Sequence, residues 1–107
     1  MNPEAIEKLI ENGRDGYEAR LAAGQARQKC GDPDRAIEHF EAATAFKPGN
    51  TVAWQALGRV RHEQGDDERA KEAWERGLAA ARANGDKQSE KVLIVWLRRL
   101  ERAASDD

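Results

Sequence analysis

A related stretch of twelve residues occurs twice in this chain of 107 residues, thirty-four positions apart. The segment KCGDPDRAIEHF begins at Lys29, and EQGDDERAKEAW begins at Glu63. When residues 17–50 are laid over residues 51–84, twelve of the thirty-four positions are identical. Self-similarity at a period of about 20–50 residues is typical of repeat proteins, whose small units bury their cores by stacking. The duplication therefore predicts repeated units rather than one large central core.

Each repeated segment carries start and stop signals for two helices, and each flanking segment carries signals for one more. An Asn or Asp that can cap a helix N-terminus precedes each stretch, and Gly follows most of them. No stretch alternates polar and apolar residues with the period of a strand, so we predict none. The expected helices and their caps are 2–13 (Asn2), 15–30 (Asp15), 32–46 (Asp32), 50–64 (Asn50), 66–83 (Asp66) and 86–104 (Asp86).

Small residues recur at equivalent places in the two helices of each segment. They let helix backbones approach closely, so each segment is expected to form a tight helical hairpin. Phe40 and Trp74, one turn further on, would fill the remaining gap. Each hairpin leaves one face unburied, which predicts that the units stack. The small residues are Gly24, Ala36, Gly58 and Ala70.

This pattern resembles the tetratricopeptide repeat (TPR) family, in which Trp, Leu-Gly, Tyr, Ala, an aromatic residue and Pro recur at set spacings. The C-terminal stretch GDKQSEKVLIVWLRRLE also looks like the tail of small stand-alone bacterial members. The second segment matches at Trp54, Leu57, Gly58, Ala70 and Trp74. The first segment matches at Gly24, Ala36, Phe40, Ala43 and Pro48.

The chain departs from the family pattern at four positions. Arg20 and Arg27 stand in the first segment where the family has Trp and Tyr, which predicts a thin core there. Arg61 replaces the Tyr in the second segment, and Arg82 replaces its final Pro. Without that Pro, the helix that begins near Asp66 should run on by about a turn.

The resemblance implies an all-α fold in which six helices form an α–α superhelix, or solenoid. Two TPR hairpins, residues 17–50 and 51–84, would lie between an N-terminal capping helix (1–13) and a C-terminal capping helix (86–104). All of them would belong to one domain that spans residues 1–107.

Composition narrows the classes of function. The formal net charge of −2 provides no strong field for nucleic acid or anionic membrane. The longest apolar run, VLIVWL, is far too short to span a bilayer, and the first residues lack the features of a secretory signal. The single cysteine, Cys30, excludes an internal disulfide, and we expect its thiol to be partly buried. These features favour a cytoplasmic location and predict neither nucleic-acid binding nor a membrane span.

No group of residues suggests catalysis. His39 and His62 fall at different points of their repeats, and neither has a Cys, Ser or carboxylate at a spacing that indicates a proton relay or a metal site. We interpret both as partly exposed structural histidines. We therefore expect a non-enzymatic protein without cofactor or metal.

Partner binding is what the resemblance implies instead. Members of the family bind an extended peptide or a helix in a groove lined by the first helix of each unit, so we expect a protein–protein interaction module. The Lys and Asn with which some members grip a terminal carboxylate are absent here. The groove positions carried over from the family are Leu21, Gln25, Gln28 and Lys29 (with Glu18) from the first segment, and Val52, Gln55, Arg59 and His62 (with Glu63) from the second.

The last predicted helix is more apolar than a terminal cap requires. Its apolar side chains cover roughly 200° of the circumference, although a cap has only one neighbour to pack against. The apolar side chains beyond those that one neighbouring helix can bury are chiefly Leu93, Trp96 and Leu97, and we assign these to the groove. Arg98, Arg99 and Arg102 would form a polar rim around them. The alternative is a self-associating structural protein that forms a homodimer through this helix. The identity of the partner and the choice between these surfaces do not follow from the sequence.

Overall fold

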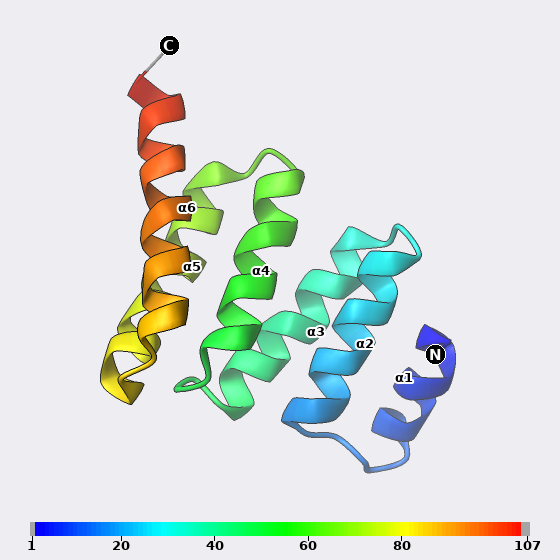
Figure 1. Cartoon of the computed structure of the whole chain (residues 1–107). Coiled ribbons are helices and arrows are strands. Elements are labelled where there is room, and N and C mark those ends of the chain that lie inside the picture. The colour runs from blue at the N-terminus through cyan, green and yellow to red at the C-terminus, as the bar shows by residue number, and fades with distance from the viewer. Residues whose placement is uncertain (1, 106–107) are drawn as a thin grey trace. The chain divides into compact units, whose positions relative to one another are not determined.

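The computed structural model describes residues 2–105, and within them the chain forms helices and turns without any strand. The helices are α1 (Pro3–Glu11), α2 (Tyr17–Lys29), α3 (Pro33–Phe46), α4 (Thr51–Glu63), α5 (Asp67–Asn84) and α6 (Lys87–Ser105) (Figure 1). They belong to two compact units: the first unit, residues 1–48, contains α1–α3, and the second unit, residues 49–107, contains α4–α6. The predicted all-α repeat fold is confirmed. None of these helices has both the length and the apolar character that crossing a membrane requires.

The repeated letters fold into the same local structure twice. The side chains of Asp32 and Asp66 each accept a hydrogen bond from the backbone N–H three residues on, at 3.3 and 3.2 Å. Both therefore act as the N-caps that the sequence predicts. The residues before them, Gly31 and Gly65, have φ values of 78° and 84°, a left-handed conformation that side chains disfavour. The paired Gly-Asp is thus required by the turn between the two helices of each hairpin.

One predicted cap is wrong. α2 begins at Tyr17, and its N-cap is Gly16, which has no side chain to cap it. The carboxylate of Asp15 instead accepts a hydrogen bond from the Arg20 Nε at 2.7 Å. This ion pair competes with capping for the same oxygen atoms, and the helix starts later than expected.

The two hairpins differ in the length of their second helices, as predicted. α3 has 14 residues and ends before Pro48, whereas α5 has 18 residues and includes Arg82, the residue that replaces the proline. α5 ends at Gly85, which adopts a φ of 69° as its C-cap. The four extra residues amount to about one turn.

Glycine and an aromatic ring meet at the centre of each hairpin. The ring of Phe40 lies against Gly24 in the first unit, and the indole of Trp74 lies against Gly58 in the second. Both aromatic side chains are buried. The predicted close approach of the paired helices therefore occurs in both repeats, with the rings occupying the space that larger side chains would need.

Each flanking helix packs against the hairpin helix next to it in the sequence. α1 lies against α2 and buries Ile6, and α6 lies against α5 (Figure 1). The contact between α5 and α6 is the more extensive of the two, and it contains an apolar core of Leu93 and Leu100 from α6 with Ala70 and Trp74 from α5. Leu93 is 0% exposed, so its assignment to an open binding surface is wrong. Its side chain is part of what holds α6 in place.

Candidate functional site

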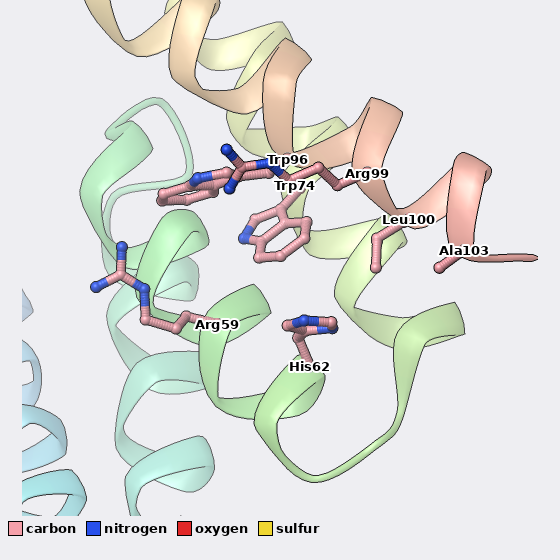
Figure 2. A pocket seen from close by; sticks show the side chains of 7 residues that line it. All are labelled: Arg59, His62, Trp74, Trp96, Arg99, Leu100 and Ala103. Carbon is pink, nitrogen blue, oxygen red and sulfur yellow. The ribbon is translucent and has the colours of Figure 1, made fainter.

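The second unit contains a pocket of about 390 Å³ into which residues of all three helices point. Figure 2 shows aromatic, basic and small apolar side chains around it. The lining residues are Arg59 and His62 from α4, Trp74 from α5, and Trp96, Arg99, Leu100 and Ala103 from α6. A volume near 300–1,000 Å³ is usual for sites that bind small ligands or single large side chains.

Trp74 forms the inner wall of this pocket because α4 and α5 approach each other closely. Gly58 leaves room for its indole, whose Nε1 donates a hydrogen bond to the backbone carbonyl of Gln55 at 3.2 Å. Only 4% of Trp74 is exposed. The ring is therefore fixed in orientation by packing on one side and by a hydrogen bond at its nitrogen.

Trp96 extends the wall toward the solvent. Its ring centroid lies 5.1 Å from that of Trp74, and the two planes are tilted by 45°, a favourable arrangement for aromatic pairs. The guanidinium carbon of Arg59 lies 5.0 Å from the Trp96 centroid, within the range of a cation–π interaction. The partly exposed Trp96 thus lies next to both a second indole and a cation, and Figure 2 shows these side chains together at the pocket.

The pocket is basic at its rim. No carboxylate lines it, and within residues 2–105 neither Arg59 nor Arg99 forms an ion pair. His62 is occupied, since its Nδ1 lies 2.7 Å from a carboxylate oxygen of Asp67. The Trp74 ring also lies 5.8 Å from the His62 ring. The pocket therefore combines an apolar floor with two cationic side chains that are available to a ligand.

A second cavity, of about 1,020 Å³, lies in the first unit between α1 and α2. It is lined by Pro3, Ile6, Ala22, Gln25, Ala26, Gln28, Lys29 and Cys30. Cys30 is exposed rather than partly buried, and its thiol lies 3.5 Å from the backbone carbonyl of Arg27. The prediction of a partly buried thiol is thus wrong, because the residue sits at the open end of α2. The polar groups here are two amides and one ammonium.

A charged cluster joins α1 to the hairpin of the first unit. Glu7 of α1 accepts hydrogen bonds from the guanidinium of buried Arg27, one of them at 2.9 Å. The Nε2 of His39 lies 2.6 Å from the same carboxylate, and the Nδ1 of His39 lies 3.2 Å from a guanidinium nitrogen of Arg20. A ring protonated at Nε2 satisfies both contacts, as donor to Glu7 and as acceptor from Arg20.

The electrostatics of this cluster indicate a structural role. The hydrogen bond from Arg27, opposed by burial and assisted by His39, lowers the pKa of Glu7 from 4.5 to about 2. The same partnership raises the pKa of Arg27 above its ordinary value. A carboxylate held ionised by a bidentate guanidinium is a poor general base. His39 is buried, not partly exposed as predicted, because it joins this cluster.

The predicted groove residues fall into three groups. Arg59, His62 and Trp96 line the pocket of the second unit, and Gln25, Gln28 and Lys29 line the cavity of the first. The others line neither: Leu21 and Leu97 are half-buried, Val52 is exposed, Gln55 is hydrogen-bonded to Thr51, and Leu93 is buried.

Sequence reasoning missed Trp74, Leu100 and Ala103 as pocket residues. The sequence assigned Trp74 only to the core. In the structure it is almost completely buried, yet part of its ring also faces the pocket. The signal for the others was available: Trp96, Arg99, Leu100 and Ala103 follow the i, i+3, i+4, i+7 spacing of one helix face. No cluster of His, Cys, Asp or Glu among the described residues could hold a metal ion.

Comparison with known proteins shows which family has this arrangement of helices. A family model described as tetratricopeptide repeat matches residues 21–88, which is more than half of the chain. The chain belongs to the tetratricopeptide repeat family. It is 40% identical over 103 residues to the TPR repeat-containing protein PA0015 of Pseudomonas aeruginosa, a match that covers 96% of this chain and 98% of that protein.

One further protein resembles the chain in sequence, and two solved structures resemble it in fold. The co-chaperone sgt12 of Aspergillus fumigatus, named for heat-shock protein cognate, is 34% identical over 78 residues, 73% of this chain but only 23% of that protein. The solution structure of BPP2914 from Bordetella parapertussis has a TM-score of 0.82 at 39% identity, covering 98% of this chain and 91% of that one. The crystal structure of MamA, at 18% identity and a TM-score of 0.70 over 98% of this chain and 70% of its own, shares the fold.

Membership of the TPR family bears on function at a coarse level. TPR proteins are generally non-catalytic adaptor modules, in agreement with the expectation of a protein that is not an enzyme. The family also indicates that the partners of this chain are proteins.

Proposed function

We propose that this TPR protein holds a segment of a partner protein, an extended peptide or a helix, in the pocket of the second unit. The observation that carries the proposal is the pair of indoles, Trp74 and Trp96, at an open pocket of about 390 Å³. Apolar surface that gathers in one place and is rimmed by polar residues often marks a site where a protein or ligand binds. The partner would insert an apolar side chain against these rings.

The character of the pocket fits a protein interface. Trp and Arg are the residues that most often dominate binding energy, and they do so from pockets near the centre of a contact. Trp96 is already oriented by Trp74 and Arg59, so little conformational freedom is lost when a ligand binds. Such preorganisation favours recognition by a rigid aromatic anchor.

The first unit supplies a separate candidate contact surface. Gln25, Gln28 and Lys29 bring amide and ammonium donors to the cavity beside α1. Amide side chains can donate to and accept from a peptide backbone, so this surface suits an extended segment. We include this surface in the proposed interaction. The proposed location of the protein is the cytoplasm.

The proposal is tested by site-directed photo-crosslinking in the source cell. A photoreactive amino acid replaces Arg99 at the pocket or, as a control, Arg76, an exposed residue of α5 outside it. A protein crosslinked only from position 99 is then purified, and its affinity is measured for the wild type and for Trp96→Ala. We expect Trp96→Ala to weaken binding at least tenfold, as for an interface hot spot. Equal crosslinking from both positions, or unchanged affinity, contradicts the proposal.

Self-association through α6 is the second candidate, favoured by one observation. Val95 is 43% exposed and lies about 200° around the helix from the buried Leu93. Two copies of this face would form a small isologous contact. Sedimentation analysis decides the matter: a dimer that persists on dilution and becomes monomeric on Val95→Asp supports this function. A monomer at all concentrations excludes it.

A further inference from the structure

We infer that the pocket of the second unit selects a partner segment in which an apolar side chain lies directly beside acidic residues. The inference rests on the proposed function and adds the chemistry of the ligand. It follows from how the lining residues are distributed between an apolar floor and a cationic rim.

The two rim arginines are charged groups without a carboxylate partner among the described residues. Two other arginines of the second unit do have such partners: Arg69 pairs with Asp66, and Arg82 pairs with Glu90 at 2.9 Å. The guanidinium of Arg59 lies over the face of Trp96, and this contact does not use its N–H groups, which can donate hydrogen bonds to a ligand. Guanidinium groups bind carboxylates through such an edge, often with two parallel hydrogen bonds.

The floor requires an apolar group. Trp74, Leu100 and Ala103 line it, and none of them offers a free donor, because the Trp74 nitrogen is bonded to Gln55. An acidic side chain alone would leave this surface in contact with water, and an apolar side chain alone would leave both arginines without a partner. A segment that carries both groups satisfies the floor and the rim together.

The rest of the molecule argues for an acidic protein segment over a nucleic acid. The chain has a formal net charge of −2, so the molecule provides no overall positive field that would attract a nucleic acid. Two arginines can neutralise one or two carboxylates but cannot follow a phosphate backbone.

The test uses three labelled peptides of equal length that differ only beside one central leucine. The flanking residues are aspartates, asparagines or lysines, and fluorescence anisotropy measures binding to the full chain. We expect the aspartate peptide to bind roughly fivefold more tightly than the asparagine peptide, and its affinity to fall as salt is added. The lysine peptide should bind most weakly.

Charge-reversal variants locate the effect. Arg59→Glu and Arg99→Glu should each remove the preference for aspartate, and together they should transfer it to the lysine peptide. The matched controls are Arg76→Glu, whose guanidinium lies 5.5 Å from the ring of Trp54 in a similar cation–π contact, and Arg98→Glu. The sequence placed Arg98 on the polar rim with Arg99, but in the structure it does not line the pocket. Both control variants should keep the wild-type preference. A helical circular dichroism spectrum for each variant confirms folding.

An unbiased selection distinguishes failure of the inference from failure of the proposed function. Random peptides displayed on phage are selected on the wild type and counter-selected on Trp96→Ala. Recovered peptides rich in acidic and apolar residues support the inference. Recovered peptides that are neutral or basic overturn it while the proposed function stands, and recovery of none overturns both. Binding of acetyl-leucine or of a single-stranded oligonucleotide as tight as that of the aspartate peptide also overturns it.

Discussion

The indole of Trp74 occupies the space that a side chain at Gly58 would need. A Cβ built on Gly58 would lie less than 3.0 Å from three atoms of that indole. The first unit repeats the relationship with Gly24 and the ring of Phe40. In the second unit the same contact also sets the position of the pocket wall, because it lets Trp74 lie between α4 and α6.

Replacing Gly58 by alanine should destabilise the second unit. An alanine in a helix interior is ordinarily favoured over glycine by about 0.5–1 kcal/mol. Here the added methyl group must displace a buried ring, and overpacking of this kind costs about 1–3 kcal/mol, so the clash should outweigh the gain. Urea denaturation followed by tryptophan fluorescence measures this, since all three tryptophans, Trp54, Trp74 and Trp96, lie in the second unit.

Gly49→Ala is the matched control for this substitution. Nothing lies within 4 Å of a Cβ at Gly49, so its alanine variant should unfold at the wild-type urea concentration or slightly above it. A Gly58→Ala variant as stable as the wild type would show that the helices do not need the close approach.

The helix boundaries were predictable because their signals are local. Asn2, Asn50 and Asp86, like the paired aspartates of the two turns, accept hydrogen bonds from the backbone at the helix starts they were assigned. Asp15 failed because an arginine one turn away competes for its carboxylate. The length of α5 followed from one missing proline. Such features depend on residues that are close together in the sequence, so the sequence predicts them.

The candidate site was only partly predictable because it depends on packing between helices. The apolar arc of α6 was visible in the sequence, but which part of it faces α5 was not, and Leu93 was therefore assigned to the wrong side. The link from Glu7 to Arg27 and His39 joins residues 20 and 32 positions apart, and no spacing rule indicates it. Arg59 and His62 were assigned to the groove by the family pattern, and Trp96 by the apolar arc of α6; all three line the pocket.

Two neighbouring substitutions on α6 should have very different effects on stability. Leu93 is fully buried, so Leu93→Ala should cost about 2–5 kcal/mol of unfolding free energy. Val95 is 43% exposed, and Val95→Ala should change stability by about 0.5 kcal/mol or less. Urea denaturation of both variants measures the difference. Equal losses would mean that α6 packs through another face.

Trp74 should contribute through both its volume and its nitrogen. Trp74→Ala removes a buried ring and should cost about 3–5 kcal/mol. Trp74→Phe keeps most of the apolar volume but loses the hydrogen bond to Gln55, so its loss of unfolding free energy should be less than half of that caused by Trp74→Ala. Thermal unfolding followed by circular dichroism compares the two variants. If phenylalanine proves as damaging as alanine, filling the space beside Gly58 is not the main role of the ring.

Glu7 should make the stability of the first unit depend on pH. Its pKa is lowered from 4.5 to about 2 in the folded chain, chiefly by the hydrogen bond from Arg27. The ionised form therefore favours folding, and this contribution is fully present above pH 4.5 and is lost as the pH falls toward 2. At neutral pH, Glu7→Gln should lower the unfolding free energy by roughly 2 kcal/mol.

The difference between wild type and Glu7→Gln should stay constant from neutrality down to about pH 4.5 and then shrink as the pH is lowered toward 3. Urea titrations followed by circular dichroism at several pH values measure it, with Glu11→Gln on the same helix as a control because Glu11 takes no part in the charged cluster. Protonation of other carboxylates affects all three proteins alike and cancels in the comparison. A difference that stays constant across this range would mean that Glu7 acts through its shape and not through its charge, and the bond from Arg27 could not then be what fastens α1 to the hairpin.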